Sequence, residues 1–175
     1  MGSLAVRPLT RSDFPLMQRW LGEPHVQRWW NQPLDLPGVE KKFAPRVAGI
    51  EPTHMFIITH DEIPIGFIQW HRWADYPEHT ARLGVEAQAA GLDLAIGDPL
   101  MIGRGLGPQV IRDFSLGVIA RAPGITAIVT DPEVLNTRSV RAFEKAGFCA
   151  VRTIQVAGEH VQRRLMRLAL AGEGS

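Results

Sequence analysis

Cysteine is nearly absent from this sequence. Cys149 is the only cysteine among 175 residues, so the chain forms no internal disulfide, and the histidines do not have the spacing of a zinc site. We therefore expect a domain that is held together by packing, without a bound metal, in a reducing cytoplasm. Because Cys149 follows Gly147 and Phe148 at the start of an apolar run, we predict a buried structural residue rather than an acyl carrier.

Long apolar runs and an excess of one charge are also missing. No stretch approaches the roughly 18 apolar residues of a membrane span, and residues 1–8 lack the apolar core of a signal peptide. The 19 Lys and Arg residues balance the 18 Asp and Glu residues to a net charge of +1. This pattern disfavours membrane insertion, secretion and nucleic acid as a partner. With 45% hydrophobic residues, we expect residues 1–175 to form a single soluble domain.

The periodicity of apolar residues predicts alternating strands and helices. We expect strands at residues 4–9, 55–59, 65–70, 91–97, 125–130, 149–154 and 161–170. We expect helices at residues 10–20, 38–47, 105–118 and 136–146, the first of them opened by a capping box of Thr10 and Asp13. Short connections, at residues 60–64 and 157–159, predict antiparallel hairpins. The order of elements indicates an α+β fold, with a central mixed, largely antiparallel sheet flanked by helices on both faces.

A glycine-rich turn lies between the predicted strand at 91–97 and the next helix. It reads Ile102-Gly103-Arg104-Gly105-Leu106-Gly107-Pro108. Glycine allows a phosphate to approach the main chain, and a helix N-terminus adds free N–H groups and positive potential. The dinucleotide pattern fails for want of a third suitably spaced glycine, and the P-loop pattern fails for want of Gly-Lys-Ser/Thr. The turn alone leaves two interpretations open, an anion-binding site and a plain glycine turn.

Two carboxylates stand out from their strands. Asp93 interrupts the apolar run at 91–97, and a charge in a buried strand requires either a partner or a function. Asp131 ends the strand at 125–130 and precedes Pro132, which places it at the edge where open sheets bind ligands. The ordinary alternatives are a turn cap or an arginine partner for Asp93 and a turn-starting role for Asp131.

The order of these motifs resembles the GCN5-related N-acetyltransferase (GNAT) superfamily. The resemblance rests on the glycine turn, on Asn136, and on the segment Phe143-Glu144-Lys145-Ala146-Gly147-Phe148. Within the superfamily, the sequence resembles the aminoglycoside 6'-N-acetyltransferases. The further matches are His25-Val26 before Trp29-Trp30, Pro64-Ile65-Gly66, Gly91-Leu92-Asp93 and Thr130-Asp131-Pro132.

The resemblance implies the GNAT fold and acetyl-CoA as the cosubstrate. The residues that it places at acetyl-CoA are Ile96, Ile102, Gly103, Arg104, Gly105, Leu106, Gly107, Pro108, Asn136, Phe143 and Lys145. Two positions depart from the family pattern. Ile102 stands where a Gln or Arg is usual, and Phe143 replaces a frequent tyrosine acid. We therefore expect water or the departing ammonium proton to protonate the thiolate, since a thiol pKa of about 8.5 makes it a tolerable leaving group.

The resemblance also implies the acceptor and the reaction. The acetyl group would pass directly, in a ternary complex, to the 6'-amine of an aminoglycoside antibiotic and so confer resistance. Asp93 would be the general base, because acetyl transfer needs an uncharged amine. The residues expected to bind this cationic acceptor are Trp30, Asp93, Asp131, Glu159 and Glu51. The ordinary alternative for Glu159 and Glu51 is an exposed surface position, and for Trp29 and Trp30 it is packing.

Two other functions remain open at this point. The same chemistry on another small amine, such as a hydroxylysine-type siderophore precursor, is favoured by His25-Val26 and the paired tryptophans. A non-catalytic acyl-CoA-binding module would keep the glycine turn and lack turnover, and Phe143 favours this alternative. Asp93 favours turnover. A monomer and a homodimer are both compatible with the sequence.

Overall fold

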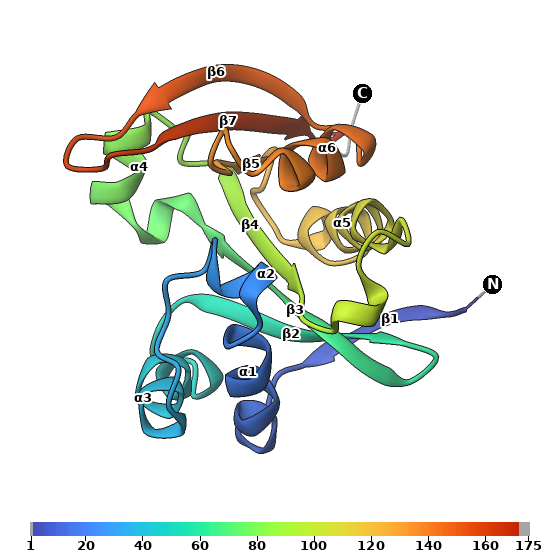
Figure 1. Ribbon diagram of the computed structural model, residues 1–175. Helices are drawn as coiled ribbons and strands as arrows, with labels where there is room; N and C mark the ends of the chain where they lie inside the picture. The colour runs from blue at the N-terminus through green and yellow to red at the C-terminus, as the bar shows by residue number, and fades with distance from the viewer. Residues whose placement is uncertain (1, 172–175) are drawn as a thin grey trace. The chain divides into compact units, whose positions relative to one another are not determined.

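The computed structural model describes residues 2–171 (Figure 1). Its strands are β1 (Leu4–Pro8), β2 (Thr53–His60), β3 (Ile63–Arg72), β4 (Ala89–Ile96), β5 (Ala127–Thr130), β6 (Cys149–Gln155) and β7 (Gln162–Ala169). Its α-helices are α1 (Phe14–Leu21), α2 (Pro24–Gln27), α3 (Leu36–Val47), α4 (Pro77–Leu83), α5 (Leu106–Gly117) and α6 (Thr137–Lys145). Short 3₁₀ segments lie at Arg11–Asp13, Trp73–Asp75, Pro99–Met101 and Ile119–Arg121.

The strands form one seven-stranded sheet in the order β1-β2-β3-β4-β5-β7-β6. The pairs β1–β2, β5–β7 and β6–β7 are antiparallel, whereas β4 and β5 are parallel. The parallel ladder is short: it pairs Ala89 with Ala127 and Ala90 with Ile128. In addition, the Thr130 hydroxyl of β5 donates to the carbonyl of Leu92 in β4 at 3.0 Å. The predicted α+β class and mixed, largely antiparallel sheet are confirmed.

The chain divides into two compact units. Among the described residues, the first unit contains residues 2–70 and 93–106, and the second contains residues 71–92 and 107–171. Strands β3 and β4 and helix α5 each contribute residues to both units. The single domain expected from the sequence stays a prediction.

The core of the first unit forms where α1 and α3 pack against β2 and β3. Met17, Phe43, Ile57 and Phe67 are completely buried in this cluster. Ile58, which follows Ile57 and points to the opposite face of the strand, is completely buried as well. Both faces of this part of the sheet are therefore covered, as expected for a sheet flanked by helices.

The predicted capping box of Thr10 and Asp13 is confirmed. A carboxylate oxygen of Asp13 accepts from the Thr10 backbone N–H at 2.8 Å, and Arg7 donates to both oxygens at 2.7 and 2.8 Å. These bonds, with Arg7 the largest contributor, hold the pKa of Asp13 below its usual value against the opposing effect of burial. The box opens a 3₁₀ turn, and α1 itself begins at Phe14.

The core of the second unit forms where β5 and β7 meet the segment around α4. Trp73 and Leu83 pack there with Val129 and Leu165, and the Trp73 indole donates to the Val129 carbonyl at 3.2 Å. The antiparallel register of β6 and β7 passes from Ala150 opposite Met166 to Arg152 opposite Leu165. Val151 is thus an extra residue, a β-bulge, in the strand at the end of the sheet.

Three local predictions differ from the structure. The loop expected at residues 60–64 is a two-residue turn, in which Asp61 and Glu62 have φ values of 49° and 67°. This conformation of a tight hairpin usually selects glycine or asparagine, and neither residue is present at 61 or 62 to indicate it. Residues 75–90, for which no strand or helix was predicted, contain α4. The prediction that Cys149 is buried is wrong: Cys149 is exposed, because β6 is an edge strand whose residues are mostly exposed.

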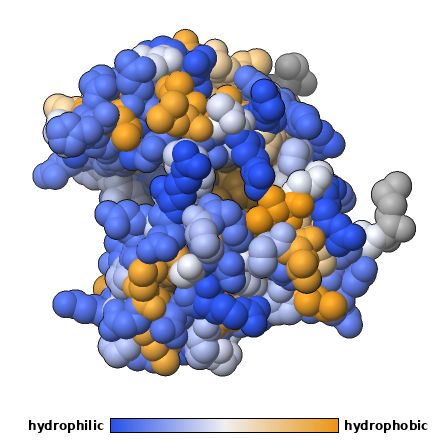
Figure 2. Space-filling view, in the orientation of Figure 1, coloured by the Kyte–Doolittle hydropathy of each residue, from blue (hydrophilic) through white to orange (hydrophobic). Residues whose placement is uncertain are grey.

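The face seen in Figure 2 is largely hydrophilic over each unit, and its hydrophobic side chains form separate patches. The large exposed hydrophobic residues are spread over different elements: Leu34, Ile50, Ile63, Leu100, Leu116, Leu135 and Val151. Among the helices of the described residues, none combines the length and apolar character needed to cross a membrane.

Candidate active site

The glycine-rich turn lies directly before α5. Gly103 and Gly105 have φ values of 75° and 77°, in the region that favours glycine, and a Cβ at either position would meet no atom within 4 Å. The space beside the turn is thus open to a ligand. Leu106 and Gly107 begin the helix, where backbone N–H groups have no intrahelical acceptor. This geometry fits a phosphate-bearing ligand, which would bind main-chain N–H groups and the positive end of the helix.

Arg104, the one charged residue of the turn, is exposed. Its guanidinium lies 3.1 Å from the sulfur of Met101. Ile102 is half-buried, and it offers no polar side-chain atom to a ligand. Any contact of the turn with a phosphate therefore comes from the main chain and from Arg104.

The other residues predicted at acetyl-CoA have structural contacts of their own. The Ile96 carbonyl, at the end of β4, accepts from the His25 ring at 2.8 Å. Asn136 is the N-cap of α6, where its side-chain oxygen accepts from the Ser139 N–H at 3.2 Å. Phe143 is 2% exposed and packs edge-to-face on Phe148. Lys145 is exposed. The roles of these four residues toward acetyl-CoA stay predictions.

Asp93, the candidate general base, lies half-buried in β4 of the first unit. One of its carboxylate oxygens accepts from the side-chain amide of Gln69 at 3.3 Å. Gln69 comes from β3 and is itself buried, with 8% of its surface exposed. The donor to Asp93 is thus the neutral amide of Gln69, where an arginine was one of the ordinary alternatives. A neutral amide orients the carboxylate without neutralising its charge.

Gln69 is held in turn by Arg46 of α3. The Arg46 guanidinium donates to the Gln69 side-chain oxygen at 2.9 Å and to Glu51 at 3.1 Å. With its oxygen bound to Arg46, the Gln69 amide has only its NH₂ group to present to Asp93. A single polar chain therefore connects Glu51, through Arg46 and Gln69, to Asp93.

Gln69 and Arg46 are functional candidates that the sequence reasoning missed. The criterion that singled out Asp93, a polar residue in an apolar strand, applies equally to Gln69, which lies between Ile68 and Trp70. No comparable signal marks Arg46, because its partners come from other elements of the unit.

The tryptophan pair divides between two surroundings in the first unit. Trp30 is half-buried and packs edge-to-face on Phe67, with ring centroids 4.9 Å apart. Trp29 is covered by the guanidinium of Arg28 at 4.8 Å from the ring centroid. Packing therefore accounts for part of the Trp30 surface, and its predicted acceptor contact stays a prediction.

The second unit brings together the two acidic residues predicted at the acceptor, Asp131 and Glu159. Arg163 of β7 lies between them, with its Nε 2.6 Å from a Glu159 oxygen and a terminal nitrogen 3.7 Å from an Asp131 oxygen. The same terminal nitrogen donates to the Asp131 carbonyl at 3.3 Å. The sequence reasoning missed Arg163 as well.

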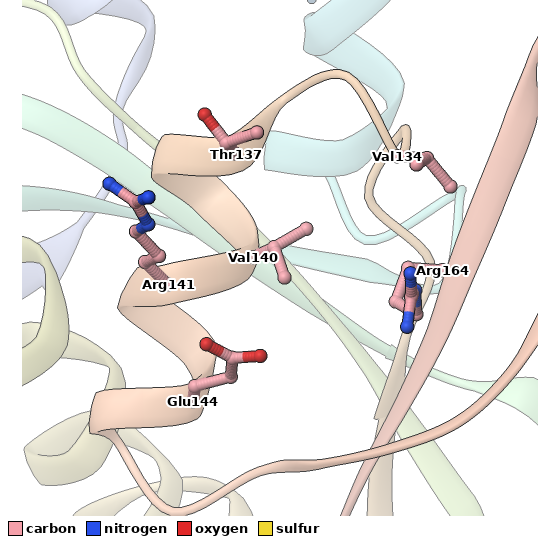
Figure 3. A pocket seen from close by; sticks show the side chains of 6 residues that line it. All are labelled: Val134, Thr137, Val140, Arg141, Glu144 and Arg164. Carbon is pink, nitrogen blue, oxygen red and sulfur yellow. The ribbon is translucent and has the colours of Figure 1, made fainter.

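A shallow pocket of about 220 Å³ also lies in the second unit (Figure 3). Its lining residues come from successive turns of α6 and from neighbouring segments: Val134, Thr137, Val140, Arg141, Glu144 and Arg164. The Nε atom of Arg164 is buried without a hydrogen-bond partner in the part of the chain that the structure describes. None of the residues predicted at the site lines this pocket.

Within residues 2–171, no group of His, Cys, Asp and Glu side chains has the arrangement of a metal site. A half-buried, oriented carboxylate on β4 and an open glycine turn before α5 are instead the parts needed for proton transfer and for binding a phosphorylated cosubstrate. A family model described as an acetyltransferase (GNAT) domain matches residues 10–156. This chain belongs to the GNAT acetyltransferase family.

This GNAT domain is similar to several characterised acyltransferases. It is 27% identical over 149 residues to aminoglycoside N(6')-acetyltransferase type 1 of Klebsiella pneumoniae, covering 83% of this chain and 74% of the relative. It is 24% identical over 168 residues to the lysine N-acyltransferase MbtK of Mycolicibacterium paratuberculosis, covering 95% and 72% of the two chains. The crystal structure of aminoglycoside acetyltransferase AAC(6')-Ib with coenzyme A and kanamycin matches with a TM-score of 0.80 and 26% identity, over 95% of each chain. The recognition of the family from its motifs is thus confirmed.

Proposed function

We propose that this chain is an acetyl-CoA-dependent N-acetyltransferase that acetylates the 6'-amine of an aminoglycoside. The observation that carries the proposal is the half-buried Asp93 carboxylate, oriented by Gln69, on the strand that leads into the glycine turn. The aminoglycoside acetyltransferases among the similar proteins support the acceptor. Membership of the GNAT family supports the cosubstrate.

The proposed reaction transfers acetyl directly between the two bound substrates. The acceptor enters as an ammonium ion, and Asp93 takes one proton, directly or through water, to free the nitrogen lone pair. The nitrogen attacks the thioester carbonyl, a C–N bond forms, the C–S bond breaks, and coenzyme A leaves as a thiolate. The thiolate gains a proton from water or from the nitrogen, which carries an excess proton after the attack. This last step needs no tyrosine, and position 143, where the family often has a tyrosine acid, is phenylalanine here.

The turn and the start of α5 would hold the cosubstrate. Main-chain N–H groups at Gly105, Leu106 and Gly107 would bind the pyrophosphate, and Arg104 would turn from Met101 toward its negative charge. Such contacts need glycine at positions 103 and 105, where the open space beside the backbone admits a phosphate.

Gln69 and Arg46 act as positioning residues in this proposal. The Gln69 NH₂ occupies one oxygen of Asp93 and leaves the other for the acceptor proton. Arg46 keeps the Gln69 amide in the orientation that makes this possible. Because Gln69 is neutral, it holds Asp93 without the strong charge pairing that would oppose proton uptake.

A second acceptor class has support of its own. The similarity to lysine N-acyltransferase MbtK extends over 95% of this chain, more than the 83% covered by the Klebsiella relative. A lysine-type or hydroxylysine-type side-chain amine is therefore the second candidate acceptor. Both candidates use the same base and the same cosubstrate, and only the acceptor differs.

Acetylation of an aminoglycoside removes the positive charge of one amine and so would confer resistance to the drug. A cytoplasmic location fits this role, because acetyl-CoA is available there. We propose that the reaction needs no metal ion.

The decisive experiment compares two drugs that differ at a single group. Neomycin carries an amine at the 6' position and paromomycin carries a hydroxyl there, while their other amines are the same. The purified chain should release coenzyme A thiol from acetyl-CoA with neomycin, and mass spectrometry should find one added acetyl group. Paromomycin should give no product. Asp93→Asn, which keeps the shape of the side chain and removes its proton affinity, should lose most of the turnover.

The other outcomes separate the alternatives. Acetylation of lysine or hydroxylysine, with neomycin left unmodified, would replace the aminoglycoside by the second candidate. Acetylation of both drugs at equal rates would refute 6' selectivity. Binding of acetyl-CoA with no turnover on any amine of a wide panel would indicate a non-catalytic module.

A further inference from the structure

Arg163 occupies the place in which an acceptor ammonium would be expected. Its guanidinium contacts both acids predicted at the acceptor, Glu159 at 2.6 Å and Asp131 at 3.7 Å. The three side chains are largely buried, with 27%, 30% and 15% of the surface of Arg163, Glu159 and Asp131 exposed. Such a partly desolvated site favours a cation beside each carboxylate, and Arg163 supplies one from the chain itself.

The Arg163 cation is permanent. Burial alone would lower the pKa of its guanidinium, but the hydrogen bond to Glu159 and the charges of Asp131, Glu159 and Glu133 outweigh burial and raise it. Arg163 therefore stays charged at every pH at which an acetyltransferase works. Glu133 is near because its backbone forms a β-bridge with that of Arg163.

A guanidinium and an ammonium compete for the same carboxylate oxygens. Arginine binds them through a rigid, planar set of donors, whereas an acceptor ammonium must displace part of this set or share the remaining oxygens. An acceptor with several ammonium groups depends on such acids more than an acceptor with one amine. Competition from Arg163 thus acts mainly on polycationic acceptors.

We propose that Arg163 is a specificity-determining residue that competes with acceptor ammonium groups for Asp131 and Glu159 and so weakens the binding of polycationic acceptors. This inference rests on the proposed function and on the expectation, from the family resemblance, that these two acids face the acceptor. It goes beyond that function because it predicts that removal of the Arg163 charge lowers the KM for a polycationic acceptor.

The same strand offers a matched control. Arg167 of β7 forms a bond of 2.7 Å with Glu86, and the two side chains are 39% and 38% exposed. Neither residue was predicted at the site. Arg167→Met therefore removes an arginine–glutamate pair from β7 without touching Asp131 or Glu159.

The experiment measures KM and kcat for kanamycin, which has several amines, and for 6-amino-6-deoxyglucose, which has one. Arg163→Met should lower KM for kanamycin roughly tenfold, because a hydrogen-bonded ion pair no longer opposes binding. KM for the monoamine should change less than about twofold, and Arg167→Met should leave both values unchanged. Arg163→Gln removes the charge while keeping a donor for Glu159, so it decides the question if the methionine variant fails to fold.

An unchanged or higher KM for kanamycin in both folded Arg163 variants would overturn the proposal. A third acceptor, lysine, gives a further test. If the Arg163 variants lose activity on lysine and keep it on kanamycin, the proposal is also overturned, because Arg163 would then bind the carboxylate of an amino-acid acceptor. Wild-type turnover is the separate test of the proposed function. If the wild type acetylates neither kanamycin nor 6-amino-6-deoxyglucose, the proposed function fails and this inference fails with it. If the wild type is active and the Arg163 variants have the same KM for kanamycin, only this inference is overturned.

Discussion

Gln69 offers the sharpest test of how the candidate base is positioned. Gln69→Leu removes the NH₂ group that donates to Asp93 and keeps a side chain of similar size in β3. Asp93 remains in place as a carboxylate. If the role of Gln69 is to orient the base, kcat should fall while the affinity for acetyl-CoA stays the same.

The distance sets the expected size of the effect. Hydrogen bonds to charged groups contribute about 1.5–3 kcal/mol. The Gln69–Asp93 bond, at 3.3 Å, is longer than the usual 2.7–2.9 Å of charge-assisted bonds, so the lower end of that range applies. A loss of about 1.4 kcal/mol in the transition state lowers kcat roughly tenfold.

A double-mutant cycle measures this coupling. Gln69→Leu should lower kcat in the wild-type background, but it should have almost no further effect when Asp93 is already Asn, because the oriented base is then missing. Gln69→Glu is the companion variant: it keeps an oxygen for Arg46 and presents a second carboxylate to Asp93, so its kcat should fall further than that of Gln69→Leu. Thermal melting of each variant gives the loss of stability, which is separate from kcat.

Additivity would refute this reasoning. If Gln69→Leu lowers kcat tenfold in both backgrounds, Gln69 affects the protein by a route other than Asp93. If Gln69→Leu changes the melting temperature and leaves kcat as in the wild type, Gln69 supports only the packing of β3.

Three further predictions follow from single contacts. Asp93→Asn should lower kcat by roughly 10²-fold at neutral pH, with the deficit shrinking at alkaline pH as free amine accumulates; a pH-independent deficit would instead make Asp93 an anchor for the ammonium. Gly105→Ala should weaken acetyl-CoA binding in calorimetry, whereas Gly124→Ala, which shares a φ near 76° and open surroundings, should not. Asp13→Asn should lower stability by about 1 kcal/mol near pH 7. Because the folded pKa of Asp13 is lowered, this contribution is fully present above the unfolded pKa of about 3.8 and is lost as pH falls from there through the lower folded pKa, so acid denaturation curves of the two proteins should converge.

The sequence predicted the fold through signals that act locally. Alternating and helical periodicities located all seven strands and the longer helices, and the Thr10–Asp13 capping box appeared where it was expected. The errors occur where burial or backbone conformation depends on the position of a residue in the folded protein. Cys149 is apolar enough for a core, yet it lies in an edge strand with one neighbour. Residues Asp61 and Glu62 adopt turn conformations that the flanking strands impose on them.

The candidate site was only partly predictable for a related reason. Asp93 and the glycine turn are visible as local exceptions, a charge in an apolar strand and glycines before a helix. The partners of Asp93 depend on which elements pack together. Arg46 reaches Gln69 from α3, 23 residues earlier in the chain, and no spacing rule connects them. Arg163 was likewise one of many arginines until the fold brought it to Asp131.

The two ends of the sheet have a consequence for the behaviour of the protein at high concentration. A bare edge strand tends to recruit a strand from another molecule, which is a common first step of aggregation. Here β1 ends in Pro8, which lacks a backbone N–H, and β6 contains the bulge at Val151, which breaks the regular spacing of donors and acceptors. Neither edge presents an uninterrupted template. The fold thus disfavours growth of the sheet from one molecule to the next, and a homodimer of this chain, if it forms, should use side-chain surfaces rather than a continuous sheet.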